Sequence, residues 1–314
     1  MIAVFLVLLL VIGLAIFYTQ RVDRSIESQF SPPGKLTTVT GGVIHWQVSG
    51  SGPAIVIVHG LLGNSKNFYE LAEILSEHYT VYSVDRPGSG FSSRMSSTSS
   101  AFEEQSSMLL EWMDKENITN AALVGHSMGG GISLRMALDA PDRIRAVTLI
   151  CPLTTMLKGG AGPLSMLYIP NHTARRAVSK TIASPLRVAM GKKQITQIFF
   201  PEAVPQDFAI EGGGLLSLHS RHFYEGSRDT VSAQGSLHRQ SSRYGEITCP
   251  VGVLYGEQDT ILNPEQHTKA VKDKIPSAIT RIVPNAGHML PMTQPSLCKN
   301  FIEDVLREAE KDCA

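Results

Sequence analysis

Hydrophobic positions are first concentrated in one long segment. Residues 2–18 are 17 consecutive uncharged and mostly apolar residues. As a helix they would extend about 25 Å, near the lower limit for crossing a bilayer core of about 30 Å. No Lys or Arg precedes the segment, whereas a signal peptide normally has a basic start. The pattern favours a retained, single-pass membrane anchor over residues 1–20. A cleaved signal peptide, with small residues at Gly13 and Ala15, and a buried core helix are the alternatives.

The segment after the apolar run predicts a linker and also the side of the membrane on which the rest of the chain lies. Arg21 and Arg24 follow the apolar run, so the positive-inside rule favours a cytoplasmic position for the rest of the chain. The segment ends in Ser-Pro-Pro-Gly, which resists helix and strand alike. We therefore expect residues 21–34 to form a tether.

After residue 34 the pattern changes to short apolar runs that alternate between strand-like and helix-like spacing. Residues 54–60, AIVIVHG, are continuously apolar, as in a strand buried on both faces of a parallel sheet. Further strand-like runs occupy residues 41–48, 80–85, 121–127, 144–151, 250–256 and 278–283, and helix-like spacing occupies residues 67–78, 102–113, 131–140, 264–274 and 295–312. The alternation predicts an α/β fold with a mostly parallel sheet and helices on both faces.

Residues 152–243 interrupt this alternation and contain few clear strands. They predict an inserted, mostly helical cap between the core segments 35–151 and 244–314. The insertion carries 11 Lys or Arg and 5 Asp or Glu, a net charge of +6. That charge would either lie on a solvated face or attract anionic lipid headgroups or an anionic substrate. Apolar side chains of the cap would pack it on the core or line an acyl pocket.

Composition excludes several classes of protein. The 314 residues are 43% hydrophobic and 18% charged, which excludes global disorder. Lys plus Arg equals Asp plus Glu, 28 each, so the chain lacks the basic excess typical of nucleic-acid binding. Four cysteines are too scattered for a disulfide scaffold, and none has zinc-site spacing. We expect no metal or organic cofactor.

The strongest chemical signal is the pentapeptide Gly125-His126-Ser127-Met128-Gly129, which fits G-x-S-x-G. It lies between a predicted strand and a predicted helix, where a sharp turn needs small residues on both sides of the serine. The helix N-terminus also favours negative charge beside Ser127. We expect Ser127 to be a nucleophile; its alternative role is a simple helix cap, which would not require the flanking glycines.

A serine nucleophile needs a base, and the base needs an acid. His288 follows the predicted strand 278–283, so its loop can extend over the same sheet edge as Ser127. Asp259 follows the strand 250–256 at that edge, and Glu257 is the rival acid. We favour Asp259, which gives the chain order Ser, Asp, His expected for a nucleophile of this kind.

A tetrahedral oxyanion requires two donors. The N–H of Met128, directly after the nucleophile, is one candidate. The other should come from residues 59–63, HGLLG, where Gly60 allows close backbone approach. We favour the Leu61 N–H, with Leu62 as its rival.

Two further histidines lie beside these motifs, at His59 and His126. Their positions favour structural hydrogen bonding beneath the loop and within the turn over a role as the base.

With these motifs the chain resembles the serine-hydrolase branch of the α/β-hydrolase superfamily over residues 35–314. The resemblance is carried by five motifs in family order and at family spacing, HGLLG (59–63), DRPGSG (85–90), GHSMGG (125–130), YGEQD (255–259) and AGHMLPMTQP (286–295). It implies an eight-stranded sheet, a lid after the sixth strand and hydrolysis of carboxylic esters. Dehalogenases and soluble epoxide hydrolases of this family carry Asp at the position of the nucleophile, where this chain has Ser127, so Ser127 argues against those reactions.

The anchor and lid are similar to those of membrane-bound monoacylglycerol lipases, which makes a lipid-like ester the expected substrate. Two alternatives stay open. The same triad would serve C–C bond hydrolysis of ring-cleavage products or acyl transfer, and the fold would also serve a non-catalytic ligand-binding protein.

Overall fold

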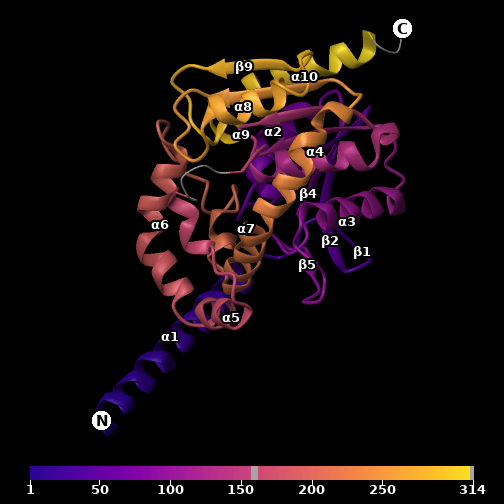
Figure 1. The fold of residues 1–314 in the computed structure, drawn as a ribbon. Helices are drawn as coiled ribbons and strands as arrows, with labels where there is room; N and C mark the ends of the chain where they lie inside the picture. Colours follow the sequence, from indigo (N-terminus) through magenta and orange to yellow (C-terminus); the bar gives the residue numbers. More distant parts are fainter. Residues whose placement is uncertain (157–161, 312–314) are drawn as a thin grey trace.

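A sheet of mostly parallel strands forms the centre of the protein (Figure 1). The structure is a computed structural model that describes residues 1–156 and 162–311. In spatial order the strands of the main path are β1 (Lys35–Val39), β2 (Gly42–Ser49), β4 (Thr80–Val84), β3 (Ala54–Val58), β6 (Ala121–His126), β7 (Ile144–Ile150), β8 (Val251–Gly256) and β9 (Ile279–Val283). The strands from β4 to β9 in this order run parallel, whereas β2 is antiparallel to β1 and β4. The predicted α/β fold is confirmed.

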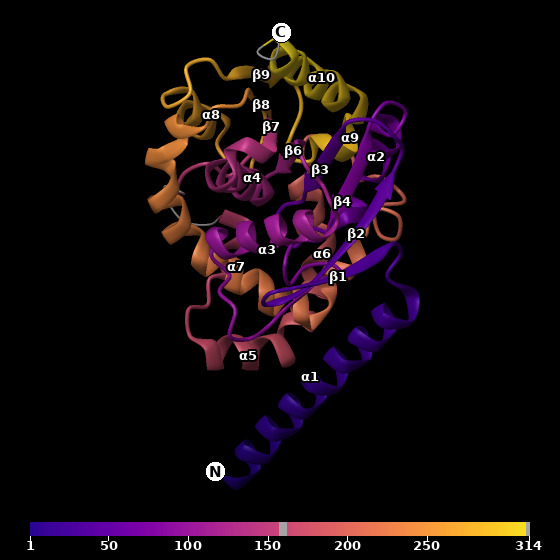
Figure 2. The same ribbon diagram turned by 90° about the vertical axis from the view of Figure 1, so that its right-hand side faces the viewer.

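Helices cover both faces of this sheet (Figure 2). The helices α2 (Tyr69–Leu75) and α10 (Pro295–Lys311) pack together on one face, and α3 (Phe102–Lys115) and α4 (Met128–Asp139) pack together on the other. The shorter helices α8 (Pro264–Lys272) and α9 (Leu290–Thr293) follow β8 and β9. Strands β3 and β6 are almost fully buried, as expected for continuous apolar runs between two helical layers. The two-residue strand β5 (Ser93–Arg94), which the sequence pattern missed, pairs with β2.

The predicted helical insertion is present between β7 and β8. It contains α5 (His172–Lys180), α6 (Ala183–Phe199) and α7 (Ser220–Gln240), together with the 3₁₀ segments η3 (Gly162–Leu167) and η4 (Gly214–Leu218). Residues 157–161 of the predicted cap lie outside the described residues. We call this helical insertion the cap.

Buried ion pairs connect the cap to the core. Arg86, which follows β4, donates to Asp229 of α7 at 3.0 Å, and Arg94 of β5 donates to the other oxygen of Asp229 at 2.8 Å. Arg94 also donates through Nε to Glu225 of α7 at 3.0 Å. All four side chains are at most 9% exposed. Such a network holds α7 in one position, because moving any member leaves a buried charge unpaired.

The N-terminal apolar segment forms the start of helix α1 (Ile2–Gln29). Its mean hydropathy reaches 2.9 over an 18-residue window, only 6% of which is buried, so by length and composition this helix is suited to a membrane span or a signal sequence. Its N-terminal half projects away from the body of the protein (Figures 1 and 2).

The predicted tether differs from the structure. Helix α1 continues without a break to Gln29, so residues 21–29 of the predicted tether are helical. Pro32 and Pro33 disfavour helical backbone only in the residue directly before each proline, so they do not disrupt the helix up to Gln29. Contacts with the cap stabilise these last turns of α1. Thr19 donates to the carbonyl of Thr181 at 2.7 Å, and Asp23 accepts from the backbone N–H of Ser220 at 2.8 Å.

Candidate active site

Ser127 occupies a strained turn between β6 and α4. Its backbone has φ 53° and ψ −122°, a conformation rare for a residue with a side chain. The positions two residues before and after Ser127 must be glycine because a side chain there would collide with the backbone. A Cβ at Gly125 would lie 2.6 Å from the Cα of Gly130, and one at Gly129 would lie 2.1 Å from the carbonyl oxygen of Val58. The motif therefore reflects the close packing of this turn against β3 and the first turn of α4.

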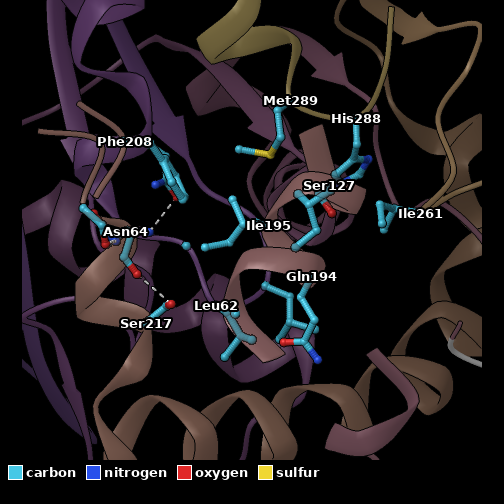
Figure 3. Close-up of a pocket in the computed structure, with 18 of the residues that line it drawn as sticks. Leu62, Asn64, Ser127, Gln194, Ile195, Phe208, Ser217, Ile261, His288 and Met289 are labelled. Atoms are coloured by element: carbon cyan, nitrogen blue, oxygen red, sulfur yellow. Dashed lines mark hydrogen bonds between the residues drawn. The ribbon is translucent and has the colours of Figure 1, made fainter. Parts of the chain in front are cut away.

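Backbone hydrogen bonds hold the turn in place. The Ser127 N–H donates to the carbonyl of Ile150 at 3.1 Å, and the Ser127 carbonyl accepts from Gly130 and Leu153 at 3.0 and 2.8 Å. The strained backbone is thus fixed by the end of β7, the segment that follows β7 and the first turn of α4. Ser127 remains 9% exposed, and its side chain faces a cavity (Figure 3).

Asp259 and His288 form a buried pair. Asp259 follows β8, His288 follows β9, and the Nδ1 of His288 lies 2.7 Å from Oδ2 of Asp259. The other carboxylate oxygen, Oδ1, accepts from the backbone N–H groups of Ile261 and Leu262 at 2.8 and 3.0 Å. Burial opposes ionisation of Asp259, but His288 and these donors outweigh it and hold the pKa of the carboxyl below its usual value.

The rival acid lies elsewhere. Glu257 is exposed and lines a separate surface groove with Lys272. Ser127 and His288, in contrast, line the same cavity, and their side chains lie next to each other in Figure 3. The structure therefore brings together the three residues that the sequence singles out, from three loops at the carboxyl edge of the sheet.

The predicted oxyanion loop passes directly against the serine. Residues 60–63 form a tight turn in which the Gly63 N–H donates to the Gly60 carbonyl at 3.2 Å. A Cβ on Gly60 would lie 2.9 Å from Cβ and 3.4 Å from Oγ of Ser127, so only glycine allows this approach. Leu61 and Leu62 both line the cavity, with Leu62 at φ 57°. Met128 begins α4, where the first N–H groups have no partner within the helix.

Two buried histidines support this arrangement, in keeping with their predicted structural roles. His59 Nδ1 donates to the carbonyl of Gly60 at 2.8 Å, and its Nε2 accepts from the Arg86 N–H at 3.0 Å. His126 Nε2 donates to the carbonyl of His288 at 2.9 Å. Burial lowers the pKa of both imidazoles to about 3, so each stays neutral and keeps its hydrogen bonds at neutral pH.

Asp259 and His288 also belong to a group of three potential metal ligands. Ligand atoms of Cys151, Asp259 and His288 lie within 4.8 Å of one another. However, burial and then the negative charge of Asp259 raise the pKa of the Cys151 thiol well above its usual value, and a metal would require the thiolate. The Cys151 Sγ instead donates to the carbonyl of Gly287 at 3.6 Å. The donor set therefore fits an acid–histidine pair better than a metal site.

The cavity beside Ser127 is mainly apolar and lies between the core and the cap (Figure 3). Its volume is about 140 Å³. Its apolar lining comes from both parts of the chain and includes Leu61, Leu62, Met166, Leu167, Ile195, Ile198, Phe208, Ile261 and Met289. It also includes Arg187 of α6, which the sequence analysis did not single out. Positive charge in the cap was predicted, but nothing in the sequence distinguished this arginine from those on the solvated surface.

Comparisons with known proteins agree with this geometry. Residues 53–295 match the family described as alpha/beta hydrolase fold. The chain is 25% identical over 270 residues to the uncharacterized hydrolase YugF of Bacillus subtilis, covering 84% of this chain and 93% of that protein. It is 26% identical over 256 residues to the sn-1-specific diacylglycerol lipase ABHD11 of Mus musculus, covering 77% of each. The crystal structure of a membrane phospholipase A, described as a bacterial virulence factor, has a similar fold, with a TM-score of 0.69, 19% identity and 98% of each chain covered. On the match to more than half of its length, this chain belongs to the α/β-hydrolase family.

Proposed function

We propose that the protein is a serine hydrolase that cleaves carboxylic esters through an acyl-enzyme on Ser127. The observation that carries this proposal is the Asp259–His288 pair, with Oδ2 and Nδ1 2.7 Å apart, in which His288 lines the same cavity as Ser127. A non-catalytic binding protein would have no need for the strained serine backbone together with the bonded acid and imidazole.

In this mechanism His288 Nε2 accepts the Ser127 proton while Oγ attacks the ester carbonyl carbon. Asp259 keeps Nδ1 protonated and stabilises the imidazolium. The N–H groups of Met128 and Leu61 stabilise the tetrahedral oxyanion. His288 then protonates the leaving alkoxide, and the alcohol departs. A water molecule, deprotonated by the same imidazole, attacks the acyl-enzyme and releases the carboxylic acid and the free serine.

The cavity supports an ester with an apolar part as the substrate. Its lining is mainly apolar with a few polar groups, as in sites for lipid-like ligands. A volume of about 140 Å³ resembles that of a cavity that binds benzene, so in this conformation it holds a short or slender acyl segment. Lipases among the similar proteins add support for lipid-like esters.

We also propose that α1 is a retained membrane anchor with the catalytic part on the cytoplasmic side. Its support is the exposed apolar half of α1 and the placement of Arg21 and Arg24 after it. The full chain should remain in membranes after an alkaline carbonate wash and should keep its intact N-terminus by mass spectrometry. Removal by the wash, cleavage near Ala15, or a C-terminal reporter active only outside the cytoplasm would contradict the respective part of this proposal.

The catalytic proposal is tested with Ser127→Ala. Loss of the nucleophile should abolish labelling by a fluorophosphonate probe and reduce p-nitrophenyl ester hydrolysis by several orders of magnitude. Ser97→Ala, at an exposed serine, is the matched control and should behave like the wild type. Unchanged ester hydrolysis in Ser127→Ala would refute the scheme. Turnover of a dienone ring-cleavage product, or transfer of the acyl group to an added alcohol in preference to water, would favour the alternative uses of the same triad.

A further inference from the structure

One lining residue of the cavity does not belong to the ester-cleaving machinery. Arg187 of α6 is only 7% exposed and lines the same cavity as Ser127. Its guanidinium donates to the carbonyl of Ser217 and, through Nη2 at 3.1 Å, to the hydroxyl of Ser217 in η4. These two acceptors are uncharged and use only part of the five N–H groups of the guanidinium.

No carboxylate pairs with Arg187 among residues 1–156 and 162–311. Outside these ranges, residues 157–161 contain no acidic residue in their sequence, and residues 312–314 contain one, Asp312. Within the part of the chain that the structure describes, Arg187 is therefore a buried cation without a carboxylate partner.

Three other buried arginines are paired with carboxylates. Arg86 and Arg94 bond to Asp229, and Arg228 bonds to Glu225 at 3.1 Å. Arg175 of α5, also 7% exposed, donates only to uncharged oxygens of Ile169, Pro170 and Ser227, but it does not line the cavity.

An unpaired buried charge is destabilising, so its retention in a ligand cavity needs an explanation. Burial lowers the pKa of Arg187 to about 10, which still leaves the guanidinium charged at neutral pH. Its fork of N–H groups suits a carboxylate or phosphate oxygen pair. The positive charge of Arg187 would be neutralised by an anionic group that enters with the substrate.

The position of Arg187 shows which part of a substrate would carry this group. Its partner Ser217 lies on the opposite side of the cavity from Ser127 in Figure 3. Apolar side chains such as Leu62 and Ile195 lie around the space between them. An anion at Arg187 would thus be separated from the reacting ester carbonyl by an apolar segment.

We propose that Arg187 binds an anionic oxygen group, carboxylate or phosphate, at the end of the substrate remote from the scissile ester, and that the enzyme selects anionic esters over neutral ones. This inference rests on the proposed ester hydrolysis and specifies its substrate class. The competing explanation is that Arg187 only joins α6 to η4 through Ser217. A purely structural role would affect neutral and anionic substrates equally.

The test compares matched substrates on the full-length protein in detergent. One pair is p-nitrophenyl hexanoate and the p-nitrophenyl monoester of adipic acid, which differ by a terminal carboxylate. The other pair is p-nitrophenyl 6-hydroxyhexanoate and its 6-phosphate ester, which differ by a terminal phosphate. The variants are Arg187→Gln, which removes the charge, and Arg187→Lys, which keeps the charge without the fork. Arg176→Gln, at an exposed arginine of α5, is the matched control for the change in net charge.

The wild type should prefer at least one anionic partner, and Arg187→Gln should lower kcat/KM for that partner by about 10–150-fold, mainly through KM. Neutral esters should change less than about threefold, and Arg187→Lys should retain part of the preference. The substrate pair in which Arg187→Gln abolishes the preference for the anionic member shows whether Arg187 binds a carboxylate or a phosphate. Absence of an anionic preference in the wild type, or an equal loss for neutral and anionic esters in Arg187→Gln, overturns the proposal.

Failure of the proposed hydrolysis gives a different result. If no ester is cleaved and no fluorophosphonate labelling occurs, binding alone decides the role of Arg187. Adipate or glycerol phosphate should then raise the melting temperature of the wild type saturably, and this shift should disappear in Arg187→Gln and persist in Arg176→Gln. No saturable shift with either anion would overturn the Arg187 proposal as well.

Discussion

Replacing Asp259 with Asn tests how the acid of the triad acts. The substitution keeps the shape of the side chain and removes its charge. Oδ1 faces two backbone donors, the N–H groups of Ile261 and Leu262, at 2.8 and 3.0 Å. The amide oxygen of Asn must take this position, because an NH₂ group there would face two donors. The NH₂ group is then forced to face Nδ1 of His288, 2.7 Å from the present carboxylate oxygen.

This orientation reverses the tautomer of the imidazole. An NH₂ group facing Nδ1 requires Nδ1 to accept, so the ring proton moves to Nε2 and the nitrogen facing Ser127 can no longer accept its proton. The corresponding substitution in a well-studied serine protease lowers kcat by about 10⁴. At about 1.36 kcal/mol for each factor of ten, we expect Asp259→Asn to raise the activation barrier by about 5 kcal/mol.

The assay measures kcat for a p-nitrophenyl ester together with the rate of fluorophosphonate labelling. Both rates should fall by similar factors at neutral pH. Glu257→Gln is the matched control, because it removes the exposed rival carboxylate and should change kcat less than about threefold. A loss below about tenfold in Asp259→Asn, or a large loss in Glu257→Gln, would refute the assignment of the acid.

Two further predictions concern stability, measured by urea unfolding in detergent. Asp229→Asn should lower the free energy of unfolding by about 3–5 kcal/mol, because buried Arg86 loses its carboxylate and Arg94 keeps only Glu225. Arg239→Ala, at an exposed arginine paired with Glu103, should cost less than about 1 kcal/mol, and similar effects of the two substitutions would contradict the network. Buried His59, His126 and His267 have pKa values of about 3, 3 and 4 against 6.5 when unfolded. The unfolded chain therefore binds more protons below pH 6.5, and stability should fall as the pH drops through this window, by about 2 kcal/mol per histidine at about pH 5. A free energy of unfolding that is flat between about pH 7 and about pH 5 would contradict those shifts.

The central sheet and the chemical motifs were predictable because each depends on local pattern. The continuous apolar run at residues 54–60 indicates a strand buried on both faces, and residues 121–127 indicate a strand that ends in a turn. The structure has β3 and β6 there. The glycines around Ser127 could be interpreted because the turn itself requires them. Asp259 and His288 were predictable as loop residues at one sheet edge, since parallel strands bring their carboxyl ends together.

Features that depend on burial of charge were not predictable in this way. Arg86, Arg94 and Asp229 are separated by up to 143 residues in sequence, and their pairing depends on where the cap comes to lie. Arg187 differs from the exposed Arg176 only in its three-dimensional surroundings. Likewise, the helical state of residues 21–29 depends on contacts with the cap, which no local pattern records.

The packing of α1 on the cap has a mechanical consequence. Thr19 and Asp23 of α1 bond to Thr181 and Ser220, the residues that precede α6 and begin α7. A change in the tilt of α1 would therefore act on α6, which lines the cavity beside Ser127, and on the start of α7, where Phe223 packs against Leu61 and Leu62. If α1 spans a bilayer, thickness and lateral tension act on that tilt. Access of substrate to Ser127 would then depend on the thickness and tension of the surrounding bilayer, through the tilt of α1.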